Sequence, residues 1–554
     1  MISATVQDIC SATSAQVIAP LAAGEASSLC AVDVVIDSRR VQKGSMFVAF
    51  AGEHTNGNAY ALRALEAGAS CICLTQDAPH DLICTAEQNG CVLLRAQNDD
   101  AQTFLLRLAH WWRTQNMHWI VVGITGSCGK TTTKDLCAQA LATRYRVHAT
   151  QGNFNNLIGV PLTILSASAQ DEVIVCEMGM NHQGELAALS RVVLPCLCVI
   201  TNIGTSHIGI LGSREAIATA KLEIITAIRG YTAPSKAPAS EHASEQPSAK
   251  TSAWQPLPTE IAPMLLLDAH DDFCAYLTRH AQQYKYDNEA GVPAQAGSTQ
   301  AGSAHGGSNL RISYINHGQP AAQPTPAASS SQAASISAGA VCIRTQAPIS
   351  LDEHGCAHTQ LTYADGATYA LSMSQPSKAA CIDALFALAI ADELACDRAA
   401  AIRAIEACSC VHMRLEEISR PHKPFIIDDS YNASPASIAQ ALAVLRHCTG
   451  YTRHIAILGE VGELGSQSAR LHDYIGAYAA ASGVDMLVFV GGEDAKRMVE
   501  AALTMGYPAE QLHYVRDVHE AQLRIAPLLR ETDAVLVKAS RACMLDVFVK
   551  GVIQ

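Results

Sequence analysis

A glycine-rich stretch near residue 126 carries a lysine and two threonines at close spacing. It follows the apolar run 118–124 and consists of Gly126, Ser127, Cys128, Gly129, Lys130, Thr131 and Thr132. A loop of this kind between a buried strand and a helix points backbone N–H groups at phosphate oxygens. Lys130 can reach the β- and γ-phosphates, and the Thr131 hydroxyl can bind Mg²⁺, so the stretch predicts a nucleoside triphosphate site. Ile124 stands where the common phosphate loop has its first glycine. The alternative is a strand–turn–helix corner that happens to contain these residues.

Two further polar side chains follow predicted strands after this loop. Glu177 comes directly after the apolar run 172–176, and His207 lies just beyond the run 197–203. Because the carboxyl ends of parallel strands meet at one edge of a sheet, both side chains should lie near the phosphate loop. A carboxylate there is a suitable partner for the same Mg²⁺ as Thr131. His207 is either a metal ligand or an ordinary polar residue.

Three other polar segments also follow predicted strands. Asp37, Ser38 and Arg39 form the first of them, and from the residues alone a solvated turn is the favoured interpretation over a ligand site. The loops 428–435 and 459–465 each follow a buried run in the last part of the chain, so both should lie on the ligand-bearing edge of that sheet. The second loop lacks the glycine spacing of a dinucleotide site, and we do not predict NAD binding.

The 554 residues are too many for one core, and strands alternate with helices along most of the chain. We predict an α/β protein with a small α/β N-terminal domain at 1–115 and a central P-loop ATPase-type domain with a mainly parallel sheet at 116–412. A Rossmann-like, doubly wound domain should follow at 413–554. The segments 231–260 and 288–337 are rich in small and polar residues, which bury too little apolar surface to hold one conformation. We therefore interpret both as mobile surface insertions in the central domain.

Net charge, apolar runs and cysteine spacing argue against several classes of protein. The formal net charge of −13 argues against nucleic acid or an anionic membrane as the main partner. The sequence contains no apolar run long enough to span a bilayer and begins without an export signal, so we expect a soluble, cytoplasmic protein. Its 20 cysteines include no C-x-x-C pair, which favours reduced thiols in the core over disulfides or zinc.

Taken together, these segments resemble the Mur ligases, the ATP-dependent amide-forming enzymes of peptidoglycan precursor synthesis. The resemblance covers all three predicted domains and skips only the two insertions. It rests on 125–132, 152–161, 202–207, 220–223, 429–435, 462–465 and 538–541. The Asp-Asn-Pro-Arg sequence by which one branch of the family selects a diamino acid is absent. The Asn-Ala-x-Pro and Gly-Glu-Leu-Gly sequences favour the branch that adds D-alanyl-D-alanine to UDP-N-acetylmuramoyl-tripeptide.

The resemblance implies ATP and two Mg²⁺ ions as cofactors, two small-molecule substrates and, we expect, a monomer. It places ATP phosphates on 126–132, one Mg²⁺ on Thr131 and Glu177, and a second on His207 and a carbamylated Lys221. Catalytic roles then fall on Lys130, Glu177, His207 and Lys221. Residues Arg414, Asp429 and Asn432 would close over the nucleotide, and Asp37, Ser38 and Arg39 would hold the uridine end of the precursor.

One segment departs from the family pattern. Family members carry Gly-x-His-Asn-x-x-Asn-Ala before an alanine-rich helix, where adenine is contacted, but this chain has 377–384 without the His-Asn pair and with Asp383 in place of the last Asn. Adenine contacts from this segment are therefore not expected to follow the family. Two alternatives stay open: another Mur-type amino-acid or folylpolyglutamate ligase, and a nucleotide-binding regulatory protein without ligase activity.

Overall fold

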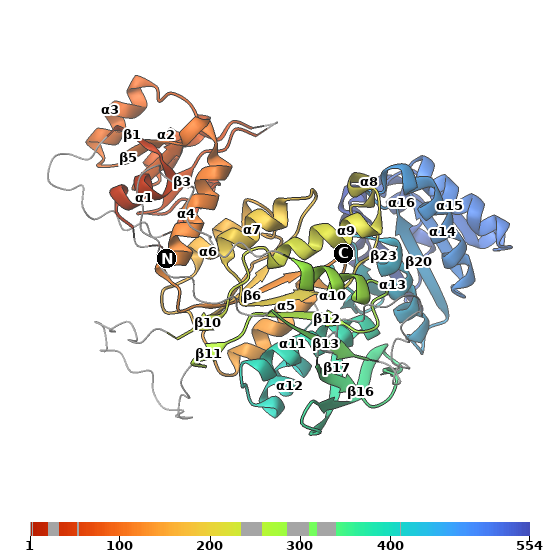
Figure 1. Ribbon diagram of the computed structural model, residues 1–554. Helices are drawn as coiled ribbons and strands as arrows, with labels where there is room; N and C mark the ends of the chain where they lie inside the picture. The colour runs from red at the N-terminus through yellow and green to blue at the C-terminus, as the bar shows by residue number, and fades with distance from the viewer. Residues whose placement is uncertain are drawn as a thin grey trace.

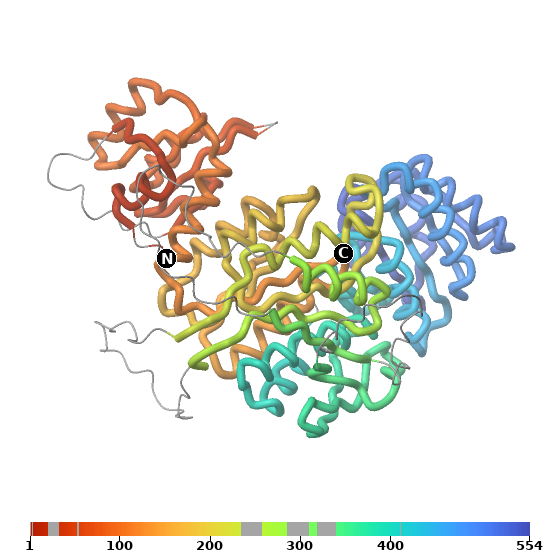
Figure 2. The backbone as a smooth tube through the Cα atoms, in the orientation of Figure 1, coloured from red at the N-terminus to blue at the C-terminus, as the bar shows by residue number. Residues whose placement is uncertain are grey.

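The structure is a computed structural model that describes residues 2, 4–19, 33–52, 55–233, 258–284, 310–317, 340–409 and 412–554. Three large sheets follow one another along the chain, and Figure 1 shows the central sheet lying between the N-terminal and C-terminal ones. The tube in Figure 2 follows the same course from red to blue. The α/β class with mainly parallel sheets is confirmed. The predicted bounds 1–115, 116–412 and 413–554 stay a prediction.

The N-terminal sheet has five strands in the order β1-β5-β4-β3-β2, all parallel except β1. Its strands are β1 (Gln16–Ala19), β2 (Val34–Val35), β3 (Met46–Val48), β4 (Cys71–Leu74) and β5 (Val92–Arg95). Its helices are α1 (Val6–Thr13), α2 (Ala61–Glu66), α3 (His80–Gln88) and α4 (Ala101–Gln115), with the short turns η1 (Ser38–Arg40), η2 (Gly57–Tyr60) and η3 (Gln97–Asp99).

Helix α4 joins this unit to the central one (Figure 1). Its apolar face buries Phe104, Leu108 and Trp112 in a core that continues into the helices of the central domain. The Trp112 indole N–H donates to the Ala167 carbonyl at 3.3 Å. Arg113 is buried and donates to the Val193 carbonyl at 2.8 Å, and burial lowers its pKa to about 10. These contacts fix the N-terminal unit against the central sheet.

The central sheet has ten strands in the order β15-β16-β14-β13-β12-β9-β6-β8-β7, with β17 on β16. The strands are β6 (Ile120–Thr125), β7 (Val147–Ala149), β8 (Val173–Glu177), β9 (Leu197–Ile200), β12 (Met264–Asp268), β13 (Arg311–Asn316), β14 (Val341–Thr345), β15 (Ser350–Leu351), β16 (Cys356–Tyr363) and β17 (Thr368–Pro376). The run from β14 to β7 is parallel, and β15 to β17 add an antiparallel edge. A separate antiparallel pair is formed by β10 (Tyr231–Thr232) and β11 (Glu260–Ile261).

Helices cover this sheet and connect its strands. They are α5 (Lys130–Ala142), α6 (Gly159–Ser166), α7 (Glu185–Val193), α8 (Ile208–Leu211), α9 (Arg214–Leu222), η4 (Glu223–Ile225), α10 (Cys274–Gln283), α11 (Lys378–Glu393) and α12 (Arg398–Glu406). Strands β6, β8 and β9 are buried along their whole length, as a parallel sheet covered on both faces requires.

The interpretation of 288–337 as one insertion is wrong. Residues 311–316 form β13, which lies between β12 and β14 in the central sheet. The sequence Arg-Ile-Ser-Tyr-Ile-Asn has strand-forming residues, and Ile312 and Ile315 are buried. Because the flanking residues are of low complexity, the average composition of 288–337 does not indicate this short strand. The ends of the other predicted insertion, 231–260, lie in the paired strands β10 and β11, while its residues 234–257 lie outside the described residues, as do 288–309 and 318–337.

The C-terminal sheet has six strands in the order β18-β19-β23-β20-β21-β22, all parallel except β18, which confirms the Rossmann-like doubly wound fold. Its strands are β18 (Glu416–Ile418), β19 (Phe425–Asp429), β20 (Arg453–Gly459), β21 (Met486–Val490), β22 (Leu512–Val515) and β23 (Asp533–Lys538). Between and after them lie α13 (Pro435–His447), η5 (Gly465–Gln467), α14 (Ser468–Ala481), α15 (Glu493–Thr504), η6 (Ala509–Gln511), α16 (Val518–Arg524), η7 (Ala526–Leu528), η8 (Arg541–Cys543) and α17 (Leu545–Ile553).

Two expectations from composition can be compared with the described residues. Every cysteine among them is a free thiol, in line with the interpretation as reduced core residues. Burial raises the pKa of Cys91 to about 12, which makes this thiol unreactive. In the part of the chain that the structure describes, no helix is long and apolar enough to cross a membrane.

Candidate active site

The glycine-rich loop connects β6 to α5 and has the backbone shape expected of a phosphate loop. Gly126 and Gly129 have φ values of 152° and 82°, which other residues rarely adopt. A Cβ on Gly126 would lie 1.8 Å from Thr201 Oγ1, so this position also has no room for a side chain. Helix α5 begins at Lys130, so its free N–H groups face the loop. The strand–loop–helix arrangement that the sequence predicts is therefore present.

The segment after β9 holds the loop in place. The Ser127 N–H donates to the Asn202 carbonyl at 3.1 Å, and the Cys128 N–H donates to Asn202 Oδ1 at 3.0 Å. In return, the Thr201 hydroxyl and the Asn202 amide donate to the Cys128 carbonyl at 2.5 and 3.1 Å. These side chains satisfy the Cys128 carbonyl. The protein's own contacts therefore hold the loop in shape, without a bound ligand. Asn202 therefore positions the loop. It lies in the family segment 202–207, but the sequence assigned it no role.

Two lysines contact the loop from different sides. Lys130 Nζ donates to the carbonyls of Gly126 and Ser127 at 2.8 and 3.4 Å. Lys221, which α9 carries into the interior, is 2% exposed and donates to the Gly126 carbonyl at 2.9 Å. Loss of solvent lowers the pKa of Lys130, and it lowers the pKa of Lys221 to well below its ordinary value. The neighbouring Lys130 charge lowers the pKa of Lys221 further.

Glu177 lies at the carboxyl end of β8 with one oxygen held and one free. The Asn155 amide donates to Oε1 at 2.7 Å, while Oε2 is buried without a hydrogen-bond partner. Thr131 is also buried, and both side chains line the same large cleft. A buried carboxylate oxygen without a donor is suited to a hard cation. The residues expected to hold Mg²⁺ therefore fit that ion. Asn155 comes from the segment 152–161, one of those on which the family resemblance rests.

His207 stands opposite the C-terminal domain. Its φ is 64°, and its Nδ1 lies 2.6 Å from Glu463 Oε2, so the ring beside it lowers the pKa of the Glu463 carboxyl. The Gly209 N–H donates to the Glu463 carbonyl at 2.9 Å, which joins the two domains at the same point. Lys221 lies behind the phosphate loop and is not part of the cleft surface, whereas His207 is. In this structure His207 therefore pairs with Glu463.

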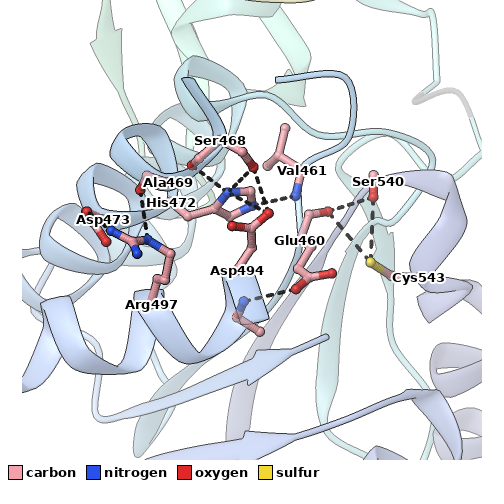
Figure 3. A network of polar contacts seen from close by, with 11 residues as sticks. Glu460, Val461, Ser468, Ala469, His472, Asp473, Asp494, Arg497, Ser540 and Cys543 are labelled. Atoms are coloured by element: carbon pink, nitrogen blue, oxygen red, sulfur yellow. Dashed lines mark hydrogen bonds and ion pairs between the residues drawn. The ribbon is translucent and has the colours of Figure 1, made fainter. Parts of the chain in front are cut away.

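The loop that carries Glu463 is anchored by a network in the C-terminal domain (Figure 3). Figure 3 shows the His472 ring pointing at the loop, where Nε2 accepts from the Val461 N–H at 3.0 Å. Nδ1 of the same ring lies 2.9 Å from the Ser468 carbonyl, so it carries the proton. The Glu460 carbonyl accepts from the Ser540 hydroxyl at 2.6 Å. Two contacts from within its own domain thus fix the start of the loop, two and three residues before the Glu463 side chain that faces His207.

The C-terminal domain supplies the opposite wall of the cleft. Lys538 is buried and donates to Asp429 Oδ2 at 2.5 Å and to the Asn432 carbonyl at 3.0 Å. Burial raises the pKa of Asp429, although Lys538 opposes this. Arg414 lies 4.6 Å above the Tyr431 ring. Lys538 was part of the family motif at 538–541, but the sequence assigned it no role.

One cleft of about 1160 Å³ brings most of the predicted residues together. Its lining includes Ser127, Cys128, Gly129, Lys130, Thr131, Thr132, Glu177, His207, Arg414, Asp429 and Asn432. The walls come close enough that Cys128 Sγ lies 3.3 Å from Ser434 Oγ, across the two domains. A cleft of this size and polarity has room for a nucleotide and parts of two further substrates.

The comparisons with known proteins agree with this arrangement. The Mur ligase middle domain matches residues 124–241, and the Mur ligase glutamate ligase domain matches residues 413–541. The UDP-N-acetylmuramoyl-tripeptide–D-alanyl-D-alanine ligase of Bacillus subtilis is 29% identical over 94% of this chain and 93% of its own length. The chain belongs to the Mur ligase family. The resemblance proposed from the motifs is confirmed.

Two solved Mur ligase structures share the fold. MurF from Acinetobacter baumannii superposes with a TM-score of 0.74 at 23% identity and covers 100% of this chain and 99% of its own. MurF from Thermotoga maritima, solved in complex with ADP, gives a TM-score of 0.66 at 20% identity and covers 95% and 98%. At these identities the likeness supports the fold of this Mur ligase and not its residue roles.

Asp383, where the family carries an asparagine, packs against the phosphate loop. A Cβ on Gly129 would lie 2.4 Å from Asp383 Oδ1, and the Thr133 hydroxyl donates to the same oxygen at 3.1 Å. The side chain is 6% exposed, and burial raises its pKa well above the ordinary value. This carboxyl therefore lies directly beside the glycine-rich loop.

The structure keeps Asp37, Ser38 and Arg39 apart from the cleft. Asp37 follows β2, caps η1 and forms a two-point ion pair with Arg39, at 2.7 Å between Oδ2 and Nη2. Arg39 lowers the pKa of Asp37 to about 2. Asp37 and Arg40 line a second cavity of about 110 Å³ between the N-terminal and central domains. Their role in holding the uridine end of a precursor stays a prediction.

Proposed function

We propose that this chain is an ATP-dependent amide ligase that adds D-alanyl-D-alanine to UDP-N-acetylmuramoyl-tripeptide in peptidoglycan precursor synthesis. The main support is similarity along nearly the whole chain to relatives that are named UDP-N-acetylmuramoyl-tripeptide–D-alanyl-D-alanine ligase. The large cleft between the glycine-rich loop and the C-terminal domain supports it. Joining a carboxylate to an amine in water needs an activated acyl group, and a triphosphate site next to space for two substrates suits that task.

The proposed reaction has two steps. The γ-phosphoryl group moves from ATP to the terminal carboxylate of the tripeptide, which gives ADP and an acyl phosphate. The free amine of D-alanyl-D-alanine then attacks the acyl carbon, the C–N bond forms, and phosphate leaves as the amine loses a proton. Positioning and neutralisation of charge supply most of the catalysis in such transfers. A cleft closed by two domains keeps water from the acyl phosphate.

Different residues of the cleft are proposed to bind the triphosphate, to hold Mg²⁺ and to contact the nucleotide from the opposite wall. Lys130 and the N–H groups at the start of α5 bind the triphosphate. Thr131 and Glu177 would hold Mg²⁺, which reduces repulsion between the phosphates and the incoming carboxylate. From the opposite wall, Arg414, Asp429 and Asn432 contact the nucleotide when the domains close, and Lys538 keeps Asp429 and Asn432 in place. Each of these roles is testable by single substitution.

Lys221 is proposed to carry a carbamate that serves a second Mg²⁺ together with His207. A neutral amine attacks the carbon of CO₂, an N–C bond forms and one proton leaves, so the side chain changes from a neutral amine to an anion. Burial and the adjacent Lys130 charge both favour the neutral amine that this step needs. An anion with two oxygens is a suitable ligand for a hard cation, which an ammonium group would repel.

The precursor is proposed to reach from the cleft to the N-terminal domain, where Asp37, Ser38 and Arg39 would hold its uridine end. The small cavity beside Asp37 supports this placement, because the N-terminal and central domains both line it. We place the reaction in the cytoplasm. We also expect a monomer, since one chain supplies both walls of the cleft.

A coupled assay of phosphate release tests the proposed activity. With UDP-N-acetylmuramoyl-tripeptide and ATP present, D-alanyl-D-alanine should release phosphate and give a product longer by two residues. Single amino acids, or glutamate with a folate, should release none. Turnover with either of these instead would favour another Mur-type or folylpolyglutamate ligase. Binding of ATP without amide formation under any condition would favour a regulatory protein.

A further inference from the structure

Two neighbouring strands of the central sheet end in residues that can ligate a metal. Asp268 is the last residue of β12, His270 follows two positions later, and His317 comes directly after β13. The two strands are parallel, with Asp268 opposite Ile315, so their carboxyl ends bring the three side chains to one edge of the sheet. Low-complexity sequence surrounds β13, and nothing in the motifs pointed to this group.

The three side chains converge on one point. His317 Nε2 lies 2.9 Å from Asp268 Oδ2, and His270 Nδ1 lies 3.8 Å from Asp268 Oδ1. The two imidazole rings are 4.5 Å apart between centroids. One ligand atom from each residue lies within 4.8 Å of the others, and this is the single such group of three among the described residues. Tetrahedral donors about 2.1 Å from a metal lie about 3.4 Å from one another, so small side-chain adjustments suffice.

We propose that Asp268, His270 and His317 bind a divalent transition-metal ion such as Zn²⁺ or Co²⁺. Two imidazoles and one carboxylate match the donor preference of these ions better than that of Mg²⁺. The Asp268 side chain is 10% exposed and those of His317 and His270 are 21% and 26% exposed, so an ion can enter from the cleft that all three line. With three protein ligands, further coordination positions stay open to water or substrate.

The neighbouring acidic residues do not belong to this group. Asp271 accepts the N–H groups of Ile203 and Phe273 at 2.9 and 2.8 Å. Asp272 forms a two-point ion pair with Arg214, with distances of 2.6 Å. These contacts hold the β12–α10 loop in place, and they leave Asp268 as the carboxylate that faces the two histidines. The ordinary alternative is an Asp268–His317 hydrogen bond with His270 packed beside it.

Uptake of Co²⁺ by the full chain separates the two possibilities. We would dialyse the protein against Co²⁺ with excess Mg²⁺ and ADP present, so that the phosphate site is filled, and record metal content and visible spectra. The variants are Asp268→Asn, His270→Gln and His317→Gln. His422→Gln is the matched control, because His422 pairs with the Glu531 carboxylate at 3.2 Å but is not part of a three-residue group.

The wild type and the control should bind one equivalent of Co²⁺ that each of the three variants lacks. Replacing a residue that only hydrogen-bonds to a metal ligand typically weakens metal binding about 10- to 100-fold. Loss of a ligand itself should weaken it at least that much. The spectrum should show nitrogen and oxygen ligation without a thiolate charge-transfer band, which excludes the cysteines. Wild type without tight Co²⁺ uptake, or uptake that all three variants keep, overturns the proposal. Asp268→Asn hardly changes shape, so a loss in that variant cannot be attributed to misfolding if its thermal unfolding matches wild type.

Discussion

Lys130 and Lys221 both donate to the carbonyl oxygen of Gly126, at 2.8 and 2.9 Å, although 91 positions separate them in the sequence (221 − 130). One carbonyl cannot stabilise two adjacent ammonium groups in a site with little water. Lys130 faces the cleft and can meet phosphates, whereas Lys221 is enclosed. Of the two lysines, Lys221 is therefore the one that loses its charge, and the neutral amine is its favoured form.

Replacing Lys221 tests whether that amine becomes a carbamate. We expect Lys221→Ala to lose on the order of 100-fold or more in turnover, the cost typical of removing one electrostatic contact from a reacting group. A short carboxylic acid in the buffer should restore part of the rate by filling the space of the missing carboxylate. The measurement is phosphate release with and without the acid, and Lys130→Ala serves as the control that the acid should not rescue. Full activity in Lys221→Ala would falsify the carbamate.

The same burial predicts how Lys221 affects stability. A lysine whose folded pKa lies below its unfolded value of about 10.4 binds fewer protons when folded. Between those two pKa values, its contribution to the free energy of unfolding therefore rises with pH. Lys221→Met removes this dependence and should stabilise the apo protein at neutral pH by about 1 kcal/mol or more. Urea unfolding at several pH values measures it, and a variant less stable than wild type at neutral pH contradicts the prediction.

Lys130→Ala should abolish turnover and leave the fold intact. The loop is shaped by Gly126, Gly129 and the contacts from Asn202, none of which needs the lysine. Loss of the charge at the β- and γ-phosphates should lower kcat/KM on the order of 100-fold or more. We would measure product formation beside thermal unfolding. Activity near that of the wild type in a folded variant would show that this loop does not bind the triphosphate.

The sequence predicted the parts of the site that are local. The phosphate loop follows from a strand, a turn and a helix that are contiguous in the chain, and Glu177 follows from its place at the carboxyl end of a buried parallel strand. The contact of Lys221 with the Gly126 carbonyl could not be predicted in this way, because it depends on how α9 packs against β6. The group at Asp268 and His317 depends on which strands are neighbours, and β13 was missed altogether. Pairing of distant strands is decided by packing of the whole sheet, which no local pattern contains.

Asp383 is expected to destabilise the protein as pH rises. Its folded pKa lies well above 3.8, so the folded state holds a proton that the unfolded state has lost. Its contribution to stability is therefore present below the unfolded pKa and falls as pH rises from there toward the folded pKa. Asp383→Asn keeps an acceptor for the Thr133 hydroxyl and removes the charge. Its gain in free energy of unfolding over wild type should grow with pH and exceed about 1 kcal/mol at neutral pH. Denaturant titrations from acidic to neutral pH measure the difference, and a gain that does not change with pH contradicts the prediction.

Gly209 and Gly465 let the central and C-terminal domains meet without side chains between them. A Cβ on Gly209 would lie 2.3 Å from the Gly465 nitrogen, so Gly209→Ala must push the two backbones apart. That movement breaks the bond from the Gly209 N–H to the Glu463 carbonyl and separates Glu463 from His207. Alanine is otherwise favoured over glycine in a helix such as α8, so the central domain by itself should not be weakened. We expect kcat/KM to fall at least about 10-fold, as small misplacements of reacting groups do, while the central domain stays folded. Gly462→Ala is the matched control, because a Cβ there meets nothing within 4 Å. Equal activity of the Gly209 and Gly462 variants would mean that this contact between the domains does not position the site.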